Sequence, residues 1–221
     1  RFTGQNPIGV RGPALSRDCG LSWQWMGADA VRQVVGQKAW EFSYRFDDKD
    51  EEVRFSFEIP YLEADLQRFL ERYRGNASLV VDELCRTRKG RRVECLRLGK
   101  VTGEPEYRVL LTARHHACES MASYALEGIM DAVLADSGDG RAWRQKVEVM
   151  VIPFVDKDGV EEGDQGKNRV PHDHNRDYGD KGIYPEVVAL RKRVPAWSKG
   201  TLAFTMDMHC PQIRGDANEH I

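Results

Sequence analysis

Residues 107–135 read YRVLLTARHHACESMASYALEGIMDAVLA and contain the clearest succession of structural patterns in the sequence. Residues 107–113 are mostly apolar and short, which suits a strand buried on both faces of a parallel sheet. Residues 120–135 then place apolar side chains at helical spacing, which predicts an amphipathic helix. A polar segment with two histidines and a glutamate lies between them. A buried strand that leads into a helix indicates the α/β class.

The same alternation continues toward the end of the chain. Residues 147–155 predict a second buried strand, residues 184–194 a short helix with Pro185 in its first turn, and residues 202–208 a third strand. Together they predict a mostly parallel or mixed sheet with flanking helices. Ligands bind beyond the carboxyl ends of such strands, so the side chains after residues 113 and 208 are expected to face one crevice.

The first third of the chain has a different pattern. In residues 39–46, aromatic residues alternate with polar ones from Trp40 to Phe46, and residues 53–59 also have period two. This alternation predicts antiparallel strands, with a further strand at 21–26, as in a β-sandwich. Residues 62–73 predict an amphipathic helix.

We therefore predict three segments. They are an antiparallel β-sandwich domain over 1–75, a connecting segment with the first strands of the next domain over 76–105, and an α/β domain over 106–221. Within the connecting segment, the basic stretch 86–92 is interpreted as a solvated hairpin turn, with contact to an acidic substrate as the alternative.

The composition is that of an ordinary globular protein. Hydrophobic residues make up 41% of the 221 residues and the formal net charge is −2, which argues against a nucleic-acid coat and a membrane-bound basic protein. No apolar run approaches the roughly 18 residues of a membrane span. Five irregularly spaced cysteines without a Cys-x-x-Cys pair predict reduced thiols and a cytoplasmic location. The first residue is Arg1 rather than Met, so we expect a preceding segment.

Two separated motifs offer the ligands of a catalytic zinc ion. His116-x-x-Glu119 and Asp207-x-His209 can supply two imidazoles and a carboxylate, which leaves a fourth position for water. The spacing of three residues to Glu119 favours His116, whereas a helical spacing of four would favour His115. The alternative for Glu119 is a structural role, because a carboxylate at a helix N-terminus complements the helix dipole.

A third motif is Asp173-His174-Asn175-Arg176. Its amide and guanidinium suit a substrate carboxylate, and Asp173 could accept a hydrogen bond from a zinc-bound imidazole. The alternative is a polar turn with a surface arginine. We interpret His172 and His174 as surface-loop residues rather than as a further metal pair.

The order of these motifs resembles the zinc metallocarboxypeptidases, and specifically their cytosolic carboxypeptidase-like branch. The matching segments are 112–119, 152–160, 173–176 and 207–209, with 59–61 and 65–70 resembling the end of that branch's N-terminal β-domain. The resemblance implies a hydrolase that removes C-terminal amino acids from peptides or proteins with a metal-activated water. It implies Zn²⁺ at His116, Glu119 and His209, substrate-carboxylate binding by Asn175 and Arg176, and a role for Asp173 in orienting His116.

The chain also departs from the family's pattern. Asp156-Lys157-Asp158-Gly159 stands where the family often has Asn-Pro-Asp-Gly, and His174 stands where it has a hydrophobic residue. For the arginine that polarises the scissile carbonyl, Arg169 is the candidate and Lys167 the alternative. The family's general-base glutamate lies well downstream of the third ligand, and Glu219, ten positions beyond His209, is a poor substitute.

These departures lead to two expectations and two alternative functions. We expect residues 1–221 to bind zinc without significant peptidase activity, and to form homo-oligomers through an unpaired apolar sheet edge. One alternative is a zinc-dependent deacylase of small N-acyl amino acids, whose site has a similar ligand order. The other is a catalytically incomplete zinc- or peptide-binding fragment. The β-domain before the zinc domain favours the peptidase.

Overall fold

The computed structural model describes residues 8–9 and 11–210. Among them the first compact unit ends at Pro60, and the second covers Tyr61–Cys210. We predicted a first domain over 1–75, and the division lies earlier because helix α1 (Glu63–Arg72) buries Leu66 and Phe69 in the core of the second unit. No helix among the described residues is long and apolar enough to cross a membrane.

The first unit contains two small antiparallel sheets. Strands β1 (Ala14–Ser16), β2 (Gln24–Trp25) and β5 (Arg54–Ser56) form one sheet in the order β2-β1-β5. Strands β3 (Val31–Gln33) and β4 (Trp40–Phe42) form the other, after the 3-10 helix η1 (Ala28–Ala30). The antiparallel pairing agrees with the prediction, and a complete β-sandwich stays a prediction.

These strands are shorter than the ranges 21–26, 39–46 and 53–59 that we predicted. The alternation does not produce a fully buried face, because Phe42 is 38% and Phe46 62% exposed. Instead the aromatic rings group together, with the ring centroids of Phe42 and Tyr44 lying 5.2 and 5.3 Å from that of Phe55. Ring contacts therefore link residues of β4 and β5, although these two strands belong to different sheets.

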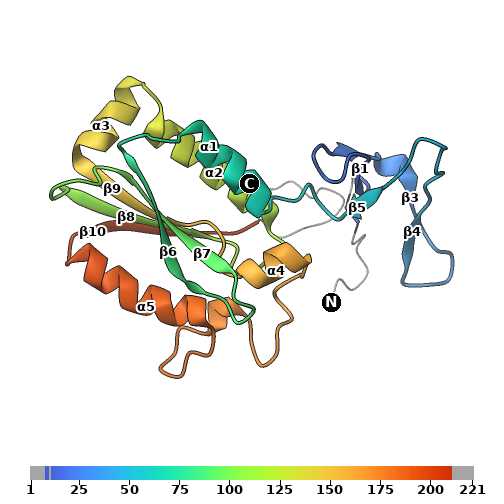
Figure 1. Ribbon diagram of the computed structural model, residues 1–221. Coiled ribbons are helices and arrows are strands. Elements are labelled where there is room, and N and C mark those ends of the chain that lie inside the picture. The colour runs from blue at the N-terminus through green and yellow to red at the C-terminus, as the bar shows by residue number, and fades with distance from the viewer. Residues whose placement is uncertain (1–7, 10, 211–221) are drawn as a thin grey trace. The chain divides into compact units, whose positions relative to one another are not determined.

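The second unit contains a five-stranded sheet in the order β10-β8-β9-β7-β6 (Figure 1). Its strands are β6 (Leu79–Arg86), β7 (Arg92–Gly99), β8 (Tyr107–Ala113), β9 (Val147–Ile152) and β10 (Leu202–Met208). Strands β10, β8 and β9 are parallel, whereas β7 and β6 are antiparallel to their neighbours. The sheet is thus mixed. Strands β8 and β10 have the predicted bounds, and β9 ends before Pro153, which cannot donate to the ladder.

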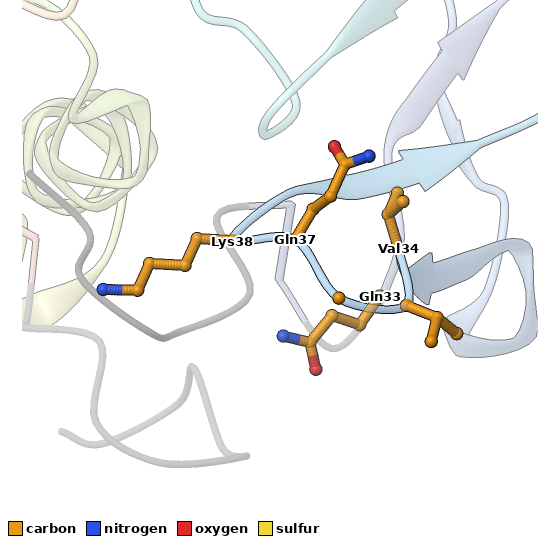
Figure 2. A pocket seen from close by; sticks show the side chains of 6 residues that line it. Gln33, Val34, Gln37 and Lys38 are labelled. Carbon is orange, nitrogen blue, oxygen red and sulfur yellow. The ribbon is translucent and has the colours of Figure 1, made fainter.

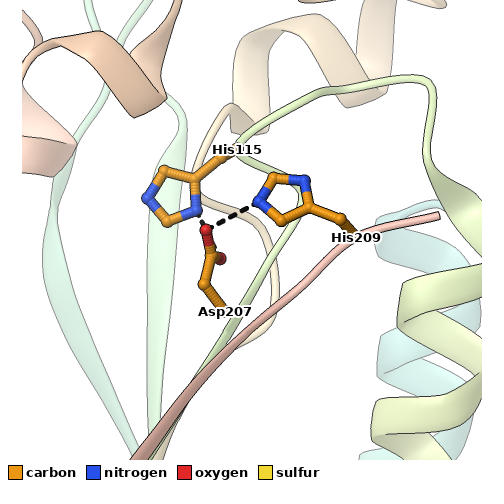
Figure 3. Close-up of side chains that lie close together, drawn as sticks. All are labelled: His115, Asp207 and His209. Atoms are coloured by element: carbon orange, nitrogen blue, oxygen red, sulfur yellow. Dashed lines mark hydrogen bonds and ion pairs between the residues drawn. The ribbon is translucent and has the colours of Figure 1, made fainter. Parts of the chain in front are cut away.

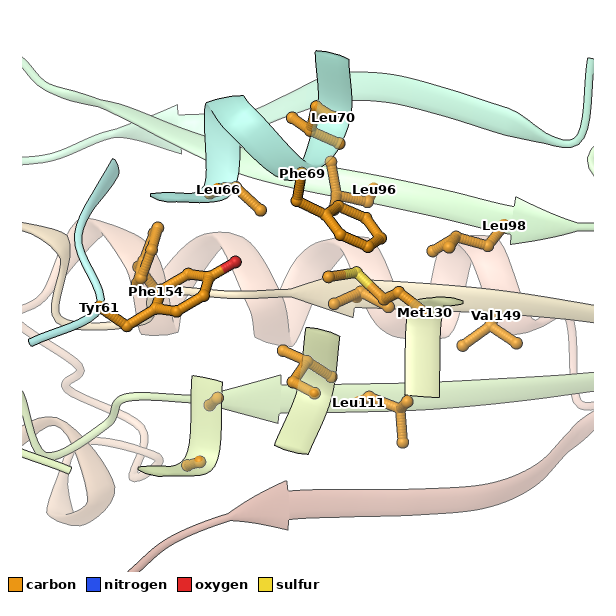
Figure 4. Packing of buried hydrophobic residues seen from close by; sticks show 14 of the residues in the cluster. Tyr61, Leu66, Phe69, Leu70, Leu96, Leu98, Leu111, Met130, Val149 and Phe154 are labelled. Atoms are coloured by element: carbon orange, nitrogen blue, oxygen red, sulfur yellow. The ribbon is translucent and has the colours of Figure 1, made fainter. Parts of the chain in front are cut away.

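Helices cover both faces of this sheet. On one face α1 and α2 (Ser120–Leu134) pack against β7, β8 and β9, and Figure 4 shows this core around Leu96, Leu111 and Met130. On the other face α5 (Pro185–Ser198) packs against the opposite side chains of the same strands. Strand β9 shows the alternation, since Val149 faces α2 and Met150 faces α5. This layered α/β architecture agrees with the prediction.

Three helical segments differ from the sequence-based expectation. Helices α3 (Gly138–Lys146) and α4 (Lys157–Glu162) were not predicted, because their glycines and polar residues suggest turns. Ser137 and Asp156 begin them by accepting backbone hydrogen bonds from Gly140 and Gly159, both 3.0 Å long. Helix α5 continues past the predicted end at Val194 to Ser198, with Pro195 inside it.

The basic stretch 86–92 connects β6 to β7, which confirms its interpretation as a hairpin turn. Two of its basic side chains form ion pairs with acidic residues of the same protein. Arg91 Nη1 lies 2.7 Å from Asp158 Oδ1, and Lys89 forms an ion pair with Glu162. Both acidic partners belong to α4, so the turn holds this helix against the sheet's end.

Strand β10 leads to a prediction about association. It lies at the end of the sheet and pairs only with β8 among the described strands, and its Phe204 is 50% exposed beside half-exposed Met206. An apolar unpaired edge favours pairing with another chain. We expect the mass of the purified chain, measured by light scattering after size exclusion, to rise with concentration, and Phe204→Lys to reduce that rise.

The matched control is Val35→Lys, which changes another exposed apolar residue in the β3–β4 turn. It should leave the association unchanged. Equal masses for Phe204→Lys and the unaltered chain at every concentration would rule out association through β10.

Candidate metal centre

The carboxyl ends of three parallel strands bring the sequence motifs together. Met208 of β10 pairs with Ala113 of β8, and Thr112 pairs with Ile152 of β9. Residues 114–119 follow β8, residues 153–177 follow β9, and His209 follows β10. As the sequence predicted, the motifs after residues 113 and 208 therefore meet at one edge of the sheet.

The turn after β8 is held by a buried arginine. Arg114 has a left-handed backbone (φ 64°), and its guanidinium donates hydrogen bonds of 2.9 Å to the carbonyls of Ala117 and Tyr61 and of 3.0 Å to Ser123 Oγ. Its own carbonyl accepts from the backbone N–H of Asp156 at 2.8 Å. Because each partner belongs to a different part of the fold, the turn presents the two histidines that follow in a defined direction.

His116, Glu119 and His209 form a group whose potential ligand atoms all lie within 4.8 Å of one another. Glu119 Oε1 is 3.1 Å from His116 Nδ1, and Glu119 Oε2 is 2.6 Å from His209 Nδ1. Both imidazoles thus turn the same nitrogen toward one carboxylate. Glu119 is only 3% exposed. Two imidazoles and a carboxylate in this arrangement suit a tetrahedral zinc with an open position.

The opposite nitrogen of each imidazole faces a second carboxylate. His209 Nε2 lies 2.7 Å from Asp207 Oδ2, and His116 Nε2 lies 3.9 Å from Asp173 Oδ2. The second contact has the length of an ion pair, and Asp173 Oδ1 also accepts from the backbone N–H of Arg176 at 3.1 Å. A carboxylate behind an imidazole is the usual support of a metal-bound histidine. We did not predict the role of Asp207, although its two-residue spacing from His209 was the signal.

The charges of this group are consistent with a cation site. Burial alone would raise the pKa of Glu119, but hydrogen bonds from His209 and Lys167 outweigh it and lower this pKa to about 2. Hydrogen bonds to Asp207 and Glu119 raise the pKa of His209 to about 9. Without a metal, a proton on His209 and the Lys167 ammonium therefore balance the buried carboxylate. A divalent cation would supply the same positive charge.

His115 belongs to a second group with Asp207 and His209, shown in Figure 3. His115 Nδ1 is 2.7 Å from Asp207 Oδ1, and His115 Nε2 is 2.7 Å from the hydroxyl of Tyr178. Both ring nitrogens of this buried histidine are therefore engaged in hydrogen bonds, and Glu119 is not in this group.

The Asp173–Arg176 motif forms a short helical turn beside the candidate metal group. Asp173 caps the 3-10 helix η2 (His174–Arg176). Asn175 Nδ2 lies 3.0 Å from His209 Nε2, so its amide reaches the group. The Arg176 side chain is exposed, and within the described part of the chain its guanidinium has no hydrogen-bond or ion-pair partner.

The structure separates the two candidate cations of the loop between α4 and η2. Arg169 is held by Asp156, with Nε and Nη2 lying 2.7 and 2.8 Å from its two carboxylate oxygens. Lys167 instead reaches the candidate metal group, where its Nζ is 2.6 Å from Glu119 Oε1. Gly166 permits this approach, because a Cβ at its positive φ would lie 2.4 Å from the backbone nitrogen of Ala117.

The interpretation of His174 as a surface residue was wrong. Its ring is buried and stacks on Tyr184 with centroids 3.9 Å apart, and its Nδ1 lies 3.7 Å from Asp156 Oδ2. The imidazole fills an apolar position through its ring face. His172 is partly exposed and its Nε2 lies 2.7 Å from Asp177 Oδ1. Neither histidine belongs to a metal-capable group among the described residues.

A hollow in the first unit is lined by residues 33–38 of the β3–β4 turn (Figure 2). Lys38 is its one charged residue, and the six lining residues are consecutive in a single hairpin turn. Its lining therefore resembles an open turn rather than a catalytic or ligand-binding site.

Glu219 lies outside the described residues.

The family model described as zinc carboxypeptidase matches residues 62–200. The chain belongs to the zinc carboxypeptidase family. This confirms the resemblance seen in the motifs. The matched range includes the His116–Glu119 and Asp173–Arg176 motifs, and His209 lies beyond it.

Relatives and solved structures agree with this membership. The chain is 26% identical over 193 residues to cytosolic carboxypeptidase 2 of Xenopus tropicalis, a match that covers 79% of this chain and 20% of that protein. Identity to cytosolic carboxypeptidase 6 of Caenorhabditis elegans is 22% over 216 residues, with 91% and 47% covered. The metallo-carboxypeptidase from Burkholderia cenocepacia shares the fold, with a TM-score of 0.73, 24% identity, and 93% and 54% covered. The chain thus spans about half or less of these proteins.

A buried lysine supports the loop that carries Asp156. Lys157 occupies the position where the family often has proline, and its side chain is fully buried. Its Nζ lies 2.9 Å from Glu94 Oε2 and 3.2 Å from Glu63 Oε2. Because Glu94 is also buried, the two charges depend on each other.

We expect Lys157→Met to lower the free energy of unfolding by about 3–5 kcal/mol, since it leaves Glu94 buried without its counter-charge. Urea denaturation measures this loss. Lys89→Met is the matched control, because Lys89 pairs with Glu162 at a largely exposed position and should cost at most about 1 kcal/mol. Equal small losses in both variants would show that the buried pair does not stabilise the fold.

Proposed function

We propose that the second unit is the metal- and carboxylate-binding part of a zinc metallocarboxypeptidase. In this proposal His116, Glu119 and His209 hold Zn²⁺. The observation that carries it is the convergence of three segments on Glu119, with the Nδ1 atoms of both histidines turned toward its carboxylate. The family membership supports the choice of metal. His116 is preferred to His115, because its Nδ1 faces Glu119 as that of His209 does, whereas the ring nitrogens of His115 face Asp207 and Tyr178.

The chemistry that zinc supplies in such sites is polarisation of the scissile carbonyl and activation of water. The chain's own residues prepare the ligands for it. In this proposal Asp207 holds a proton on Nε2 of His209 through their 2.7 Å contact, and Asp173 faces Nε2 of His116 from 3.9 Å, so that each Nδ1 lone pair would be available to the metal. Lys167 is the cation that we propose to face the substrate carbonyl, because it already lies at the group while Arg169 is bound by Asp156.

We propose that Arg176 and Asn175 bind the C-terminal carboxylate of a peptide or protein. The Arg176 guanidinium is exposed and suits a planar carboxylate, which it can contact with two parallel hydrogen bonds. Asn175 connects this position with the metal group through its 3.0 Å contact with His209. Holding the substrate's end beside the metal would orient the scissile bond, which is a large part of catalysis.

We propose that the group that transfers the proton lies outside the described residues. The carboxylates of Glu119, Asp173 and Asp207 each contact an imidazole, and Glu119 also pairs with Lys167. None of these three is available to take a proton from water and pass it to the leaving amine. This part of the proposal would be wrong if the 221-residue chain carrying Glu219→Gln still released C-terminal residues with zinc.

The two curated relatives compared above are both named cytosolic carboxypeptidases. On that ground, and from the reduced cysteines that the sequence predicts, we propose a cytoplasmic location. Fractionation of cells that express the protein, with detection by antibody, would test it, and recovery with secreted proteins would contradict it.

Zinc binding is tested by removing one ligand at a time. We expect the unaltered chain to hold one zinc per molecule after dialysis, and His116→Ala and His209→Ala to lose it, because each removes one of three protein ligands. Elemental analysis of the dialysed proteins measures the stoichiometry. His172→Ala is the control, since this histidine pairs with Asp177 and belongs to no metal-capable group. Full zinc content in both ligand variants would refute the assignment.

Carboxylate binding is tested with a dipeptide and its C-terminal amide on the zinc-loaded chain. We expect Arg176→Ala to weaken binding of the free acid by roughly 10- to 100-fold, as for loss of a charge-assisted hydrogen bond, and to change amide binding little. Arg176→Lys should not restore it, because lysine lacks the planar fork. Calorimetry measures both affinities, with exposed Arg191→Ala on α5 as control. Equal weakening for acid and amide would mean that Arg176 has a structural role.

A further inference from the structure

We propose that His115 and Tyr178 position the third metal ligand through a hydrogen-bond chain that runs Tyr178–His115–Asp207–His209. This inference rests on the proposed zinc site, and it gives a role to two residues that neither the ligand set nor the carboxylate site uses. They act through Asp207 and are positioning residues.

The carboxylate of Asp207 is fixed from several directions. Its Oδ1 accepts from His115 Nδ1 at 2.7 Å, and its Oδ2 contacts His209 Nε2 at 2.7 Å (Figure 3). Thr112 Oγ1 also donates to Oδ1 at 2.8 Å. Donors at Oδ1 leave the carboxylate little freedom to rotate. The direction in which Oδ2 meets His209 therefore depends on His115.

The hydrogen bonds of this chain have a consistent polarity. Asp207 is an acceptor, so the proton of His115 lies on Nδ1 and its Nε2 accepts from the Tyr178 hydroxyl. In the same way His209 donates Nε2–H to Asp207, which leaves its Nδ1 lone pair on the side of Glu119. With a metal on Nδ1, His209 would be neutral, as a metal ligand must be, and its Nε2–H would still be held by Asp207.

The hydrogen-bond chain also connects the carboxylate-binding residues with the metal ligands of the proposed site. Tyr178 follows Arg176 by two residues, in the same segment as the carboxylate-binding pair, whereas Asp207 and His209 belong to the strand β10 and its end. His115 lies between them after β8. A displacement of the carboxylate-binding segment would therefore change the position of the metal ligand His209. The hydrogen bonds thus fix the position of the carboxylate-binding residues relative to the metal ligands.

The experiment measures zinc dissociation constants of the 221-residue chain by competition with a chromophoric chelator. We expect His115→Gln to weaken zinc binding by about 10- to 100-fold, the usual effect of removing an outer partner of a metal-bound histidine. Tyr178→Phe should weaken it less. The double variant should bind no more weakly than His115→Gln alone, because the hydroxyl acts only through His115.

Two matched controls make the same chemical changes elsewhere in this segment. His172→Gln removes a histidine that pairs with Asp177, and Tyr184→Phe removes a hydroxyl that donates to the carbonyl of His172. Neither residue forms a hydrogen bond or an ion pair with a member of the hydrogen-bond chain among the described residues. Both controls should keep the zinc affinity within about twofold, while the metal-free melting temperatures show whether any variant has lost its fold.

A second readout separates positioning from ligation and from simple destabilisation. With Co²⁺ as the probe, His115→Gln should still bind one ion per chain and should shift the visible absorption bands, because the ligands are retained but reoriented. Loss of stoichiometric binding in His115→Gln would make His115 a ligand and overturn the proposal. Unshifted bands together with unchanged zinc affinity in both variants would also overturn it.

The outcomes also distinguish this inference from the function on which it rests. If the unaltered chain binds no zinc, the proposed function fails and takes this inference with it. If the unaltered chain binds zinc but losses in the double variant are additive, only the coupling through His115 is refuted. If His115→Gln fails to fold, Tyr178→Phe removes only a single hydroxyl. Its zinc affinity then still decides whether the hydrogen-bond chain affects the metal ligand His209.

Discussion

The buried carboxylate of Glu119 is the group on which this part of the molecule depends. It is 3% exposed and carries its charge, so it requires positive partners close by. His209 and Lys167 provide them, each at 2.6 Å, and the imidazole of His116 lies beside the same carboxylate at 3.1 Å. These three residues come from three different segments, each after a different parallel strand. The negative charge of Glu119 is therefore compensated only when the three parallel strands lie side by side in the sheet.

The loops around this carboxylate are built to keep that geometry. Arg114 closes the turn that carries Glu119, and the buried Lys157–Glu94 pair holds the start of the loop that carries Lys167. Such buried ionic groups cost free energy unless their partners stay in place, so they restrict the loops to a single path. The apolar cores on the two faces of the sheet supply the stability on which this arrangement relies.

The same charge balance links folding with metal binding. In the metal-free chain, protonated His209 and the Lys167 ammonium surround Glu119. In the proposed site, His116, Glu119 and His209 would hold the cation in place of the proton on His209 Nδ1, and Lys167, no longer needed to balance Glu119, would be free to face a substrate. Ligands must be deprotonated before they bind a metal, so zinc and the proton compete at this group.

The periodicity of the sequence was enough to predict the parallel strands of the second unit, the helix after the first of them and the grouping of the motifs. The apolar runs 107–113 and 202–208 are strands with those bounds, and the helical spacing after residue 120 is α2. Because parallel strands end at one edge, the meeting of His116, Glu119 and His209 was also predictable. Only the tertiary structure decided that Lys167 rather than Arg169 reaches Glu119, that His174 is buried on Tyr184, and that α1 joins the second unit. Each of these depends on the path of a loop, which is set by packing and charge pairing between residues far apart in the chain and leaves no periodic pattern in the sequence.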